Sequence, residues 1–324
     1  MIIWLWVGFI ILILFLLALD LGVLNRKEHI ISIREAFLWS AFWIVLSLIF
    51  SGLIYFLYEH HILDIGLHTN ASVNGHQAFF EYLTGYIIEK SLSLDNIFVI
   101  ALIFSYFKVP AIYQHRVLFW GILGAIILRG AMILAGSALI NNFSWIIYVF
   151  GIFLIITALR MLKSHHEKIE PDKNLFVKIA RKIYPVTPEF HGKSFFISLN
   201  KKSAATPLFI ALLVVESSDV LFAVDSIPAI FAITRDPFIV FTSNIFAILG
   251  LRSLYFALAA MIAKFYYLKY SLVIILMFVG IKMLISEIYH IPTLISLSVV
   301  GGILTAGILA SVYHSKNLDS TISK

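Results

Sequence analysis

Five carboxylates stand inside long apolar stretches of the sequence, where an ionised group must find a compensating charge. They are Glu89, Asp95, Glu216, Asp219 and Asp225. Each charged side chain at the centre of a membrane helix costs about 2.5–3.5 kcal/mol on insertion scales. The basic residues available to pair with them are Lys90, Arg129 and Arg252, so two negative charges stay unbalanced when all of these groups are ionised. A bound divalent cation would balance them, as would two protons.

Other side chains with oxygen atoms accompany these acids. They are Asn96, Asn244, Ser91, Ser93, Ser217, Ser218 and Ser226. The chain has no cysteine, and no histidine or methionine stands close to the acids in sequence. An all-oxygen set of ligands suits Mg²⁺, Mn²⁺ or Ca²⁺ rather than Cu⁺ or Zn²⁺. The acids could instead be ion-paired contacts between helices, and for Arg129 and Arg252 we favour that interpretation, as counter-charges that fix the carboxylates.

The stretch around Glu89 resembles the stretch around Asp219. In both, a second acid follows six residues later, and a polar residue and an isoleucine come next. The following apolar stretch carries one arginine in each case. We therefore predict a repeat of three helices, over residues 79–162 and 207–288. Three crossings in each unit give the two units opposite orientations, and inverted repeats place substrate sites near the bilayer midplane, where the units meet.

The composition of the whole chain indicates an integral membrane protein. Of its 324 residues, 61% are hydrophobic and only 13% are charged, and the mean hydropathy is +0.97. A soluble protein of this length could not bury so much apolar surface, whereas lipid solvates it directly. We predict an all-α, polytopic membrane helix bundle that forms a single transmembrane domain over residues 1–324. About nine segments are long enough to cross the bilayer: 2–24, 37–58, 79–105, 117–138, 144–162, 207–233, 238–263, 270–288 and 292–313.

Lysine and arginine are distributed unevenly between the connecting loops. Alternate loops and the C-terminal tail hold nineteen of them, and the opposite loops hold only Arg235. Because basic loops stay in the cytoplasm, we expect the N-terminus outside and the C-terminus inside. The basic cytoplasmic loop 163–206 should contain a short amphipathic helix that lies on the anionic inner leaflet. The apolar residues of this helix are Leu175, Phe176, Ile179 and Ile183.

Helix geometry limits which of the acids can act together. Glu216 and Asp219 are three residues apart and share one face of a helix. Acids six residues apart differ by about 240° in direction and do not. Pro228 follows three residues after Asp225 and removes a helical hydrogen bond. We therefore expect a broken helix at Pro228, which would turn Asp225 toward the site and free backbone carbonyls as ligands.

Three runs of sequence resemble those of the TerC family. They are Glu89-Lys-Ser-Leu-Ser-Leu-Asp95-Asn96, Glu216-Ser-Ser-Asp219-Val-Leu-Phe-Ala-Val-Asp225-Ser-Ile-Pro228-Ala, and the run from Asp236 to Arg252, which is close to the family's Alx branch. The likeness covers nearly the whole chain. It implies a protein of the bacterial inner membrane, linked to manganese export, alkaline-pH induction, tellurium resistance or redox modulation; with the orientation expected from the basic loops, its N-terminus would be periplasmic. It also implies that the metal ligands are Glu89, Asp95, Asn96, Glu216, Asp219 and Asp225.

These patterns together favour a transporter. We expect Mn²⁺ export by alternating access, in which the two three-helix units rock about a midplane site and protons from outside drive the exchange. The rival interpretation is a membrane sensor, scaffold or redox modulator that transports nothing and holds a structural or regulatory ion. No nucleophile–base pair, phosphate-binding glycine loop or HExxH motif occurs, so we expect no enzyme activity. The basic residues serve topology, so the expected partners are the bilayer and the cation rather than nucleic acid.

Overall fold

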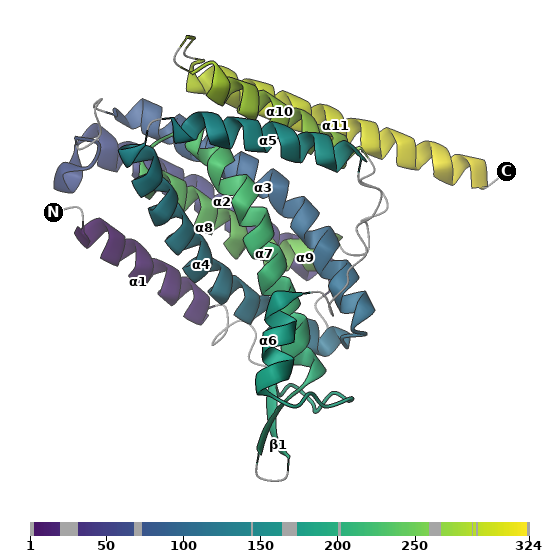
Figure 1. The fold of residues 1–324 in the computed structure, drawn as a ribbon. Helices are drawn as coiled ribbons and strands as arrows, with labels where there is room; N and C mark the ends of the chain where they lie inside the picture. The colour runs from purple at the N-terminus through teal and green to yellow at the C-terminus, as the bar shows by residue number, and fades with distance from the viewer. Residues whose placement is uncertain are drawn as a thin grey trace.

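A computed structural model describes residues 3–19, 32–67, 73–143, 145–163, 174–199, 202–258, 267–286, 288–289 and 291–322 of the chain. Within these ranges the protein is almost entirely helical (Figure 1). The α-helices are α1 (Ile3–Leu19), α2 (Ile33–Glu59), α3 (Gly75–Tyr106), α4 (Ala111–Asn142), α5 (Ile146–Lys163), α6 (Leu175–Ile183), α7 (Pro207–Phe231), α8 (Pro237–Leu249), α9 (Leu251–Leu258), α10 (Leu268–Leu284) and α11 (Thr293–Ile322). A short 3₁₀ turn, η2 (Ile62–Asp64), follows α2, and two strands, β1 (Phe196–Leu199) and β2 (Lys202–Ala205), precede α7.

Each of the predicted spanning segments contains a helix. Five helical stretches are long and apolar enough to cross a bilayer, namely α2, α4, α7, the combined α8 and α9, and residues Thr293–His314 of α11. The shorter apolar helices α1 and α5 add to them. The ends of two predicted segments, 20–24 and 259–263, lie outside the described residues. The prediction of a polytopic helical membrane protein is confirmed.

The helix boundaries follow from side chains that cap the first turn. Ser32 precedes α2 and accepts a hydrogen bond from the Glu35 amide, and Asn74 does the same for α3. Proline at the first position opens α7 and α8, where the missing amide hydrogen would have no helical partner. The Asp236 carboxylate accepts from two amides at the start of α8. These caps and prolines fix where α2, α3, α7 and α8 begin.

The packing crosses between the two predicted repeat units. The first helix of each unit packs against the second helix of the other, so that α3 contacts α8 and α4 contacts α7. The two first helices, α3 and α7, also contact each other, and α5 packs on α10. A two-fold axis between the two units would produce this pair of contacts, α3 with α8 and α4 with α7. The repeat itself, over residues 79–162 and 207–288, stays a prediction.

The helices α5 and α10 cross at two glycines. A Cβ atom added to Gly280 would lie 2.8 Å from the Gly151 carbonyl oxygen, and one added to Gly151 would lie 2.9 Å from the Gly280 carbonyl oxygen. Both distances are shorter than real Cβ contacts, and the obstacle is backbone that cannot turn aside. The side-by-side placement of α5 and α10 (Figure 1) therefore depends on the absence of side chains at this point.

Replacing Gly280 with alanine should accordingly destabilise the fold. We expect a loss of about 1–3 kcal/mol, the usual cost of overpacking a core, seen as a lower midpoint of thermal unfolding in detergent. The matched control is Gly301→Ala in α11, where an added Cβ meets nothing within 4 Å. Equal midpoints for the two variants would contradict the close crossing of α5 and α10.

The expected break at Pro228 is wrong. The helix α7 continues through Asp225 to Phe231, and Pro228 lies in its last turn, where its carbonyl accepts the capping hydrogen bond from the Ala232 amide. Proline still removes the hydrogen bond to the Val224 carbonyl, but α7 ends three residues later, so no further turn of the helix depends on that bond. The break occurs instead in the seventh predicted segment, between α8 and α9 at Gly250. There the Lys90 ammonium donates to the Ala247 carbonyl at 3.2 Å.

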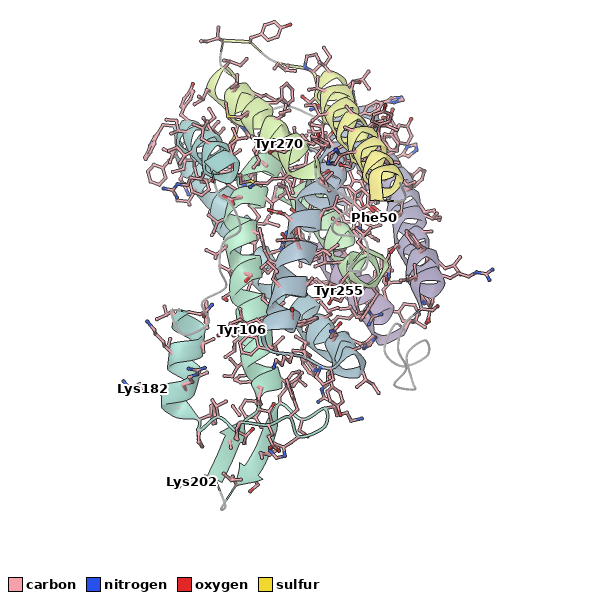
Figure 2. All side chains as sticks on the ribbon, turned by 90° about the vertical axis from the view of Figure 1, so that its right-hand side faces the viewer. Phe50, Tyr106, Lys182, Lys202, Tyr255 and Tyr270 are labelled. Atoms are coloured by element: carbon pink, nitrogen blue, oxygen red, sulfur yellow. The ribbon has the colours of Figure 1, made fainter. Side chains whose placement is uncertain are left out.

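The loop before α7 holds more structure than the sequence indicated. Residues Leu175–Ile183 form the predicted helix, α6, and β1 and β2 form an antiparallel hairpin that was not predicted. Figure 2 shows Lys182 of α6 and Lys202 of the hairpin at the same end of the molecule. The helix α6 lies beside the first half of α7, on which it packs Val177 and Ala180, while Leu175 and Ile183 are exposed. Residues 164–173 of the predicted basic loop lie outside the described part.

Candidate functional site

The Arg129 guanidinium, fully buried on α4, is the centre of the polar core. Its Nε and Nη2 atoms donate to the two carboxylate oxygens of Asp219 on α7, at 3.0 and 2.8 Å. Its Nη1 atom donates to Glu89 on α3, to the Asn244 carbonyl at 3.2 Å and to the Ser226 hydroxyl at 3.5 Å. The arginine thus joins the two predicted repeat units through their matching acids. We call these five residues the Arg129 network.

Glu89 is also fixed from α8. The Asn244 amide nitrogen donates to Glu89 Oε2 at 3.0 Å, so both carboxylate oxygens of Glu89 accept hydrogen bonds. Paired, bidentate bonds between arginine and carboxylate are strong and directional, and burial makes the loss of either partner costly. In this structure Arg129 is thus ion-paired with both Glu89 and Asp219, one acid from each of the two predicted repeat units.

Glu216 lies one turn before Asp219 on α7 and is held differently. Its Oε2 atom is buried and has no hydrogen-bond partner among the described residues. Its carboxylate lies against Gly124 of α4, so closely that a Cβ atom on Gly124 would overlap it. The two acids interact electrostatically and share one face of α7. Glu216 is therefore a half-buried acid beside the Arg129 network, with one buried oxygen that no described donor occupies.

A cavity extends from Asp219 between α3, α4, α7 and the α8–α9 pair. Its polar lining consists of Asn96, Ser218 and Asp219, and the remaining lining is apolar, including Ile100, Leu118 and Phe222. The Asn96 side-chain carbonyl is buried and also lacks a hydrogen-bond partner in the described structure. Asn96 thus shares this cavity with Asp219, whereas Glu216 is not among the lining residues and adjoins Asp219 along α7. Buried acceptors are usually satisfied, so this combination indicates room for a bound donor or cation.

The other predicted site residues lie around this centre in different environments. Asp225 accepts a hydrogen bond from Thr157 of α5 at 3.0 Å and is half-buried, and Asp95 is half-buried on α3. The hydroxyls of Ser91 and Ser218 donate to carbonyls of their own helices. Two more members of the predicted set, Ser93 and Arg252, are buried on α3 and α9.

The acids do not converge into a preformed metal cage. No three acidic or histidine side chains lie close enough to hold a metal ion in the parts of the chain that the structure describes. In this conformation Glu89 and Asp219 neutralise Arg129 instead. A cation that uses the predicted ligand set Glu89, Asp95, Asn96, Glu216, Asp219 and Asp225 would therefore require these side chains to rearrange.

Sequence reasoning missed two residues of the site. Gly124 shapes the space for Glu216, and Thr157 binds Asp225 from α5. Neither carries a charge, and a glycine or threonine in an apolar helix gives no signal of its own. The one available hint is the inverted repeat, because it predicts that the second helix of one unit faces the first helix of the other.

Comparison with known proteins identifies the family. The family model described as "Integral membrane protein TerC family" matches residues 74–319, which is most of the chain. This protein belongs to the TerC family. The "Uncharacterized membrane protein STKORF319" of Myxococcus xanthus is 50% identical to this chain over 313 residues. These residues cover 97% of this chain and 93% of the relative. No solved structure matches the chain.

Other relatives carry a functional name. The "Putative membrane-bound redox modulator Alx" of Photorhabdus laumondii is 46% identical to this TerC-family chain over 314 residues, or 96% of the chain and 95% of the relative. The protein of the same name from Escherichia coli K12 is 46% identical over 301 residues, or 93% of the chain and 91% of the relative. The resemblance to the Alx branch of the family is confirmed.

Proposed function

We propose that this TerC-family protein exports a divalent metal cation, in the first place Mn²⁺, across the bacterial inner membrane. The observations that carry the proposal are two buried oxygens that have no donor among the described residues: Oδ1 of Asn96, which lines a cavity together with Asp219, and Oε2 of Glu216, one turn before Asp219 on α7. They offer oxygen ligands of the kind that hard cations use. They also lie where helices of the two oppositely oriented units meet, which is the usual position of transporter sites.

The charge of the site supports a divalent ion. Three carboxylates, from Glu89, Glu216 and Asp219, surround one guanidinium, that of Arg129. When all are ionised, two negative charges remain in a region that excludes water. A divalent cation balances both charges and supplies the partner that the Glu216 oxygen lacks. Two protons would also balance them, and this exchangeability is what a cation–proton antiporter needs.

The Arg129 network suggests how the site could load. In the described conformation, Arg129 holds Asp219 with two hydrogen bonds. A cation that arrives beside Glu216 would compete with Arg129 for the Asp219 carboxylate, and release of that carboxylate would loosen the contact between α4 and α7. Since α4 and α7 belong to different predicted units, cation binding would then favour a movement of one unit against the other. We propose that the cation loads from the cytoplasm and leaves on the periplasmic side.

The choice of Mn²⁺ rests on the family and not on the geometry. Oxygen ligands alone suit Mg²⁺, Mn²⁺ and Ca²⁺, and the resemblance to the Alx branch favours manganese. The periplasmic N-terminus and cytoplasmic C-terminus, which follow from the basic loops, are part of the same proposal.

A rival function is suggested by the relatives named as redox modulators. A chain without cysteine has no thiol chemistry of its own, so redox work would require a bound cofactor. The absorbance spectrum of the purified protein separates the two functions. A flavin, haem or iron–sulfur spectrum at equal stoichiometry would favour the rival over cation export.

The fit of Gly124 against Glu216 allows a direct test of transport. In liposomes that enclose a Mn²⁺-sensitive dye, Gly124→Ala should slow Mn²⁺ flux strongly, because the new methyl group displaces the Glu216 carboxylate. The protein should still fold, since the end of a flexible side chain can move away. The matched control is Gly52→Ala on α2, where an added Cβ meets nothing within 4 Å.

The outcomes of this test are distinct. Flux with the wild type and with Gly52→Ala, but not with Gly124→Ala, supports a cation route past Glu216. Wild-type flux no faster than that of protein-free vesicles, for Mn²⁺, Mg²⁺ and Ca²⁺ alike, contradicts the transport function and favours the rival.

A further inference from the structure

A second group of buried ionisable side chains lies at the opposite end of α3 from Tyr106, away from the Arg129 network. It consists of Glu81 on α3, Asp236 at the start of α8, Lys282 on α10 and Tyr58 at the end of α2. All four are buried, although three of them carry charge in their ordinary states. We call these residues the outer cluster, because the sequence predicts that the α7–α8 turn lies outside the membrane. The cation site proposed above uses none of them.

Glu81 is the member whose hydrogen bonding is incomplete. Only 4% of this residue is exposed. Its Oε1 atom accepts a 2.7 Å bond from Gln77, but its Oε2 atom is buried without a hydrogen-bond partner in the described residues. The carboxylate interacts electrostatically with Asp236 and Lys282, and the Thr234 side chain is a further hydrogen-bonding neighbour of it. A proton on Oε2 would turn this bare acceptor into a donor, which is the simplest way to satisfy it.

The other members of the outer cluster are committed to partners. Tyr58 donates to Asp236 Oδ2 at 2.7 Å, and the Asp236 Oδ1 atom caps α8. The Lys282 ammonium donates to Ser296 of α11 at 2.9 Å. Burial raises the pKa of the Asp236 carboxyl above its ordinary range, although its hydrogen bonds oppose the rise. These elements, α2, α8, α10 and α11, therefore surround Glu81 with one cation, one further acid and neutral donors.

A line of polar side chains links the outer cluster to the Arg129 network. Glu81 and Glu89 are eight residues apart on α3, or about 12 Å along the helix. Between them, Gly85 leaves room for the Ser243 hydroxyl of α8, which an added Cβ would approach to 2.9 Å. The next residue, Asn244, is hydrogen-bonded to Glu89. Ser243 and Asn244 are both fully buried, so the α3–α8 contact carries polar groups from one cluster toward the other.

We propose that Glu81 is the carboxylate that exchanges protons with the outer solution and couples them to cation export. In this step Oε2 takes one proton from the outer solution as the cation leaves, and it gives up that proton on the cytoplasmic side after the two units have changed orientation. The charges of Lys282 and Asp236 act on the Glu81 carboxylate both before and after it takes up the proton. The proposal rests on the proposed export function and adds the residue that makes the exchange proton-coupled.

The test uses the full-length protein in liposomes and measures two quantities. The first is exchange of radioactive Mn²⁺ against unlabelled Mn²⁺ at equal concentrations, which needs no net proton movement. The second is the change of internal pH when a Mn²⁺ gradient is applied. We expect Glu81→Gln to keep the exchange and to lose the proton movement. The matched control is Glu189→Gln, an exposed carboxylate between α6 and β1, which should keep both.

Each result bears on the proposal. Proton movement that survives in Glu81→Gln overturns it, and so does a wild type that exchanges Mn²⁺ but moves no protons, although export itself then stands. A wild type without Mn²⁺ exchange overturns both the export function and this coupling. If Glu81→Gln does not fold, Glu81→Asp decides, because a shorter carboxylate in the same place should couple with a shifted pH dependence, and an unchanged pH dependence would overturn the role of Glu81.

Discussion

Replacement of Arg129 with alanine is expected to destabilise the protein by about 3–5 kcal/mol, the usual cost of removing one partner from a buried ion pair. The reason is that Glu89 and Asp219 would be left as buried anions, and Asn244 and Ser226 would each lose a bond to the guanidinium. The measurement is the midpoint of thermal unfolding in detergent, together with the yield of folded protein from membranes. Arg129→Lys should lie between the wild type and alanine, since lysine keeps the charge but loses the planar two-pronged geometry.

A rescue experiment separates charge from packing at Arg129. The combination of Arg129→Leu with Glu89→Gln and Asp219→Asn removes the buried charges of the pair together, and neutral replacements of buried ion pairs are often tolerated. We expect the triple variant to be more stable than Arg129→Leu alone. A triple variant that is no more stable than the single one would show that the arginine acts by filling space. That result would contradict its assignment as the counter-charge of Glu89 and Asp219.

Replacement of Glu216 with glutamine is expected to weaken cation binding without lowering the stability of the protein. The carboxylate has a buried oxygen that lacks a partner among the described residues, and burial and the neighbouring Asp219 both disfavour a charge on it. Loss of that charge should therefore leave the unfolding midpoint unchanged or raise it. Binding of Mn²⁺, measured by calorimetry on the detergent-solubilised protein, should weaken by on the order of 10–100-fold, a range seen even for groups that only support metal ligands.

Arg129 and Glu216 should therefore differ in whether their replacement changes the stability of the protein or its cation affinity. A purely structural acid would lower stability when neutralised and would leave cation affinity alone. Glu189→Gln, on the exposed surface, serves as the control for a change of one charge. Unchanged Mn²⁺ affinity in Glu216→Gln, with a lower unfolding midpoint, would remove Glu216 from the cation site and assign it to the helix packing.

The sequence was sufficient to predict the helices and the centre of the site. Long apolar runs identify spanning helices because lipid imposes one pattern on all of them, and the matched acids around Glu89 and Asp219 indicate where two units meet. Arg129 was also interpretable, since a lone arginine in an apolar run requires an acid as its partner. Charge in an apolar setting is the strongest local signal that a membrane sequence contains.

The remaining features depend on contacts between distant segments. The break between α8 and α9 occurs at Gly250, where an added Cβ would lie 2.7 Å from the Lys90 ammonium of α3, and this approach is invisible in either segment alone. Pro228 was expected to break α7, but its effect depends on how soon the helix ends. The placement of Asp225 against Thr157, away from the Arg129 network, depends on where α5 crosses α7. Periodicity and composition do not determine such crossings.

The most direct test of the account is an anomalous-scattering map from crystals of the protein soaked with Mn²⁺. The account predicts one strong peak in contact with the carboxylates of Glu216 and Asp219 and with the Asn96 side chain, accompanied by a shift of Arg129 away from Asp219. A map with no peak there, in which Arg129 still binds both Glu89 and Asp219 while manganese occupies another place or none, would contradict it.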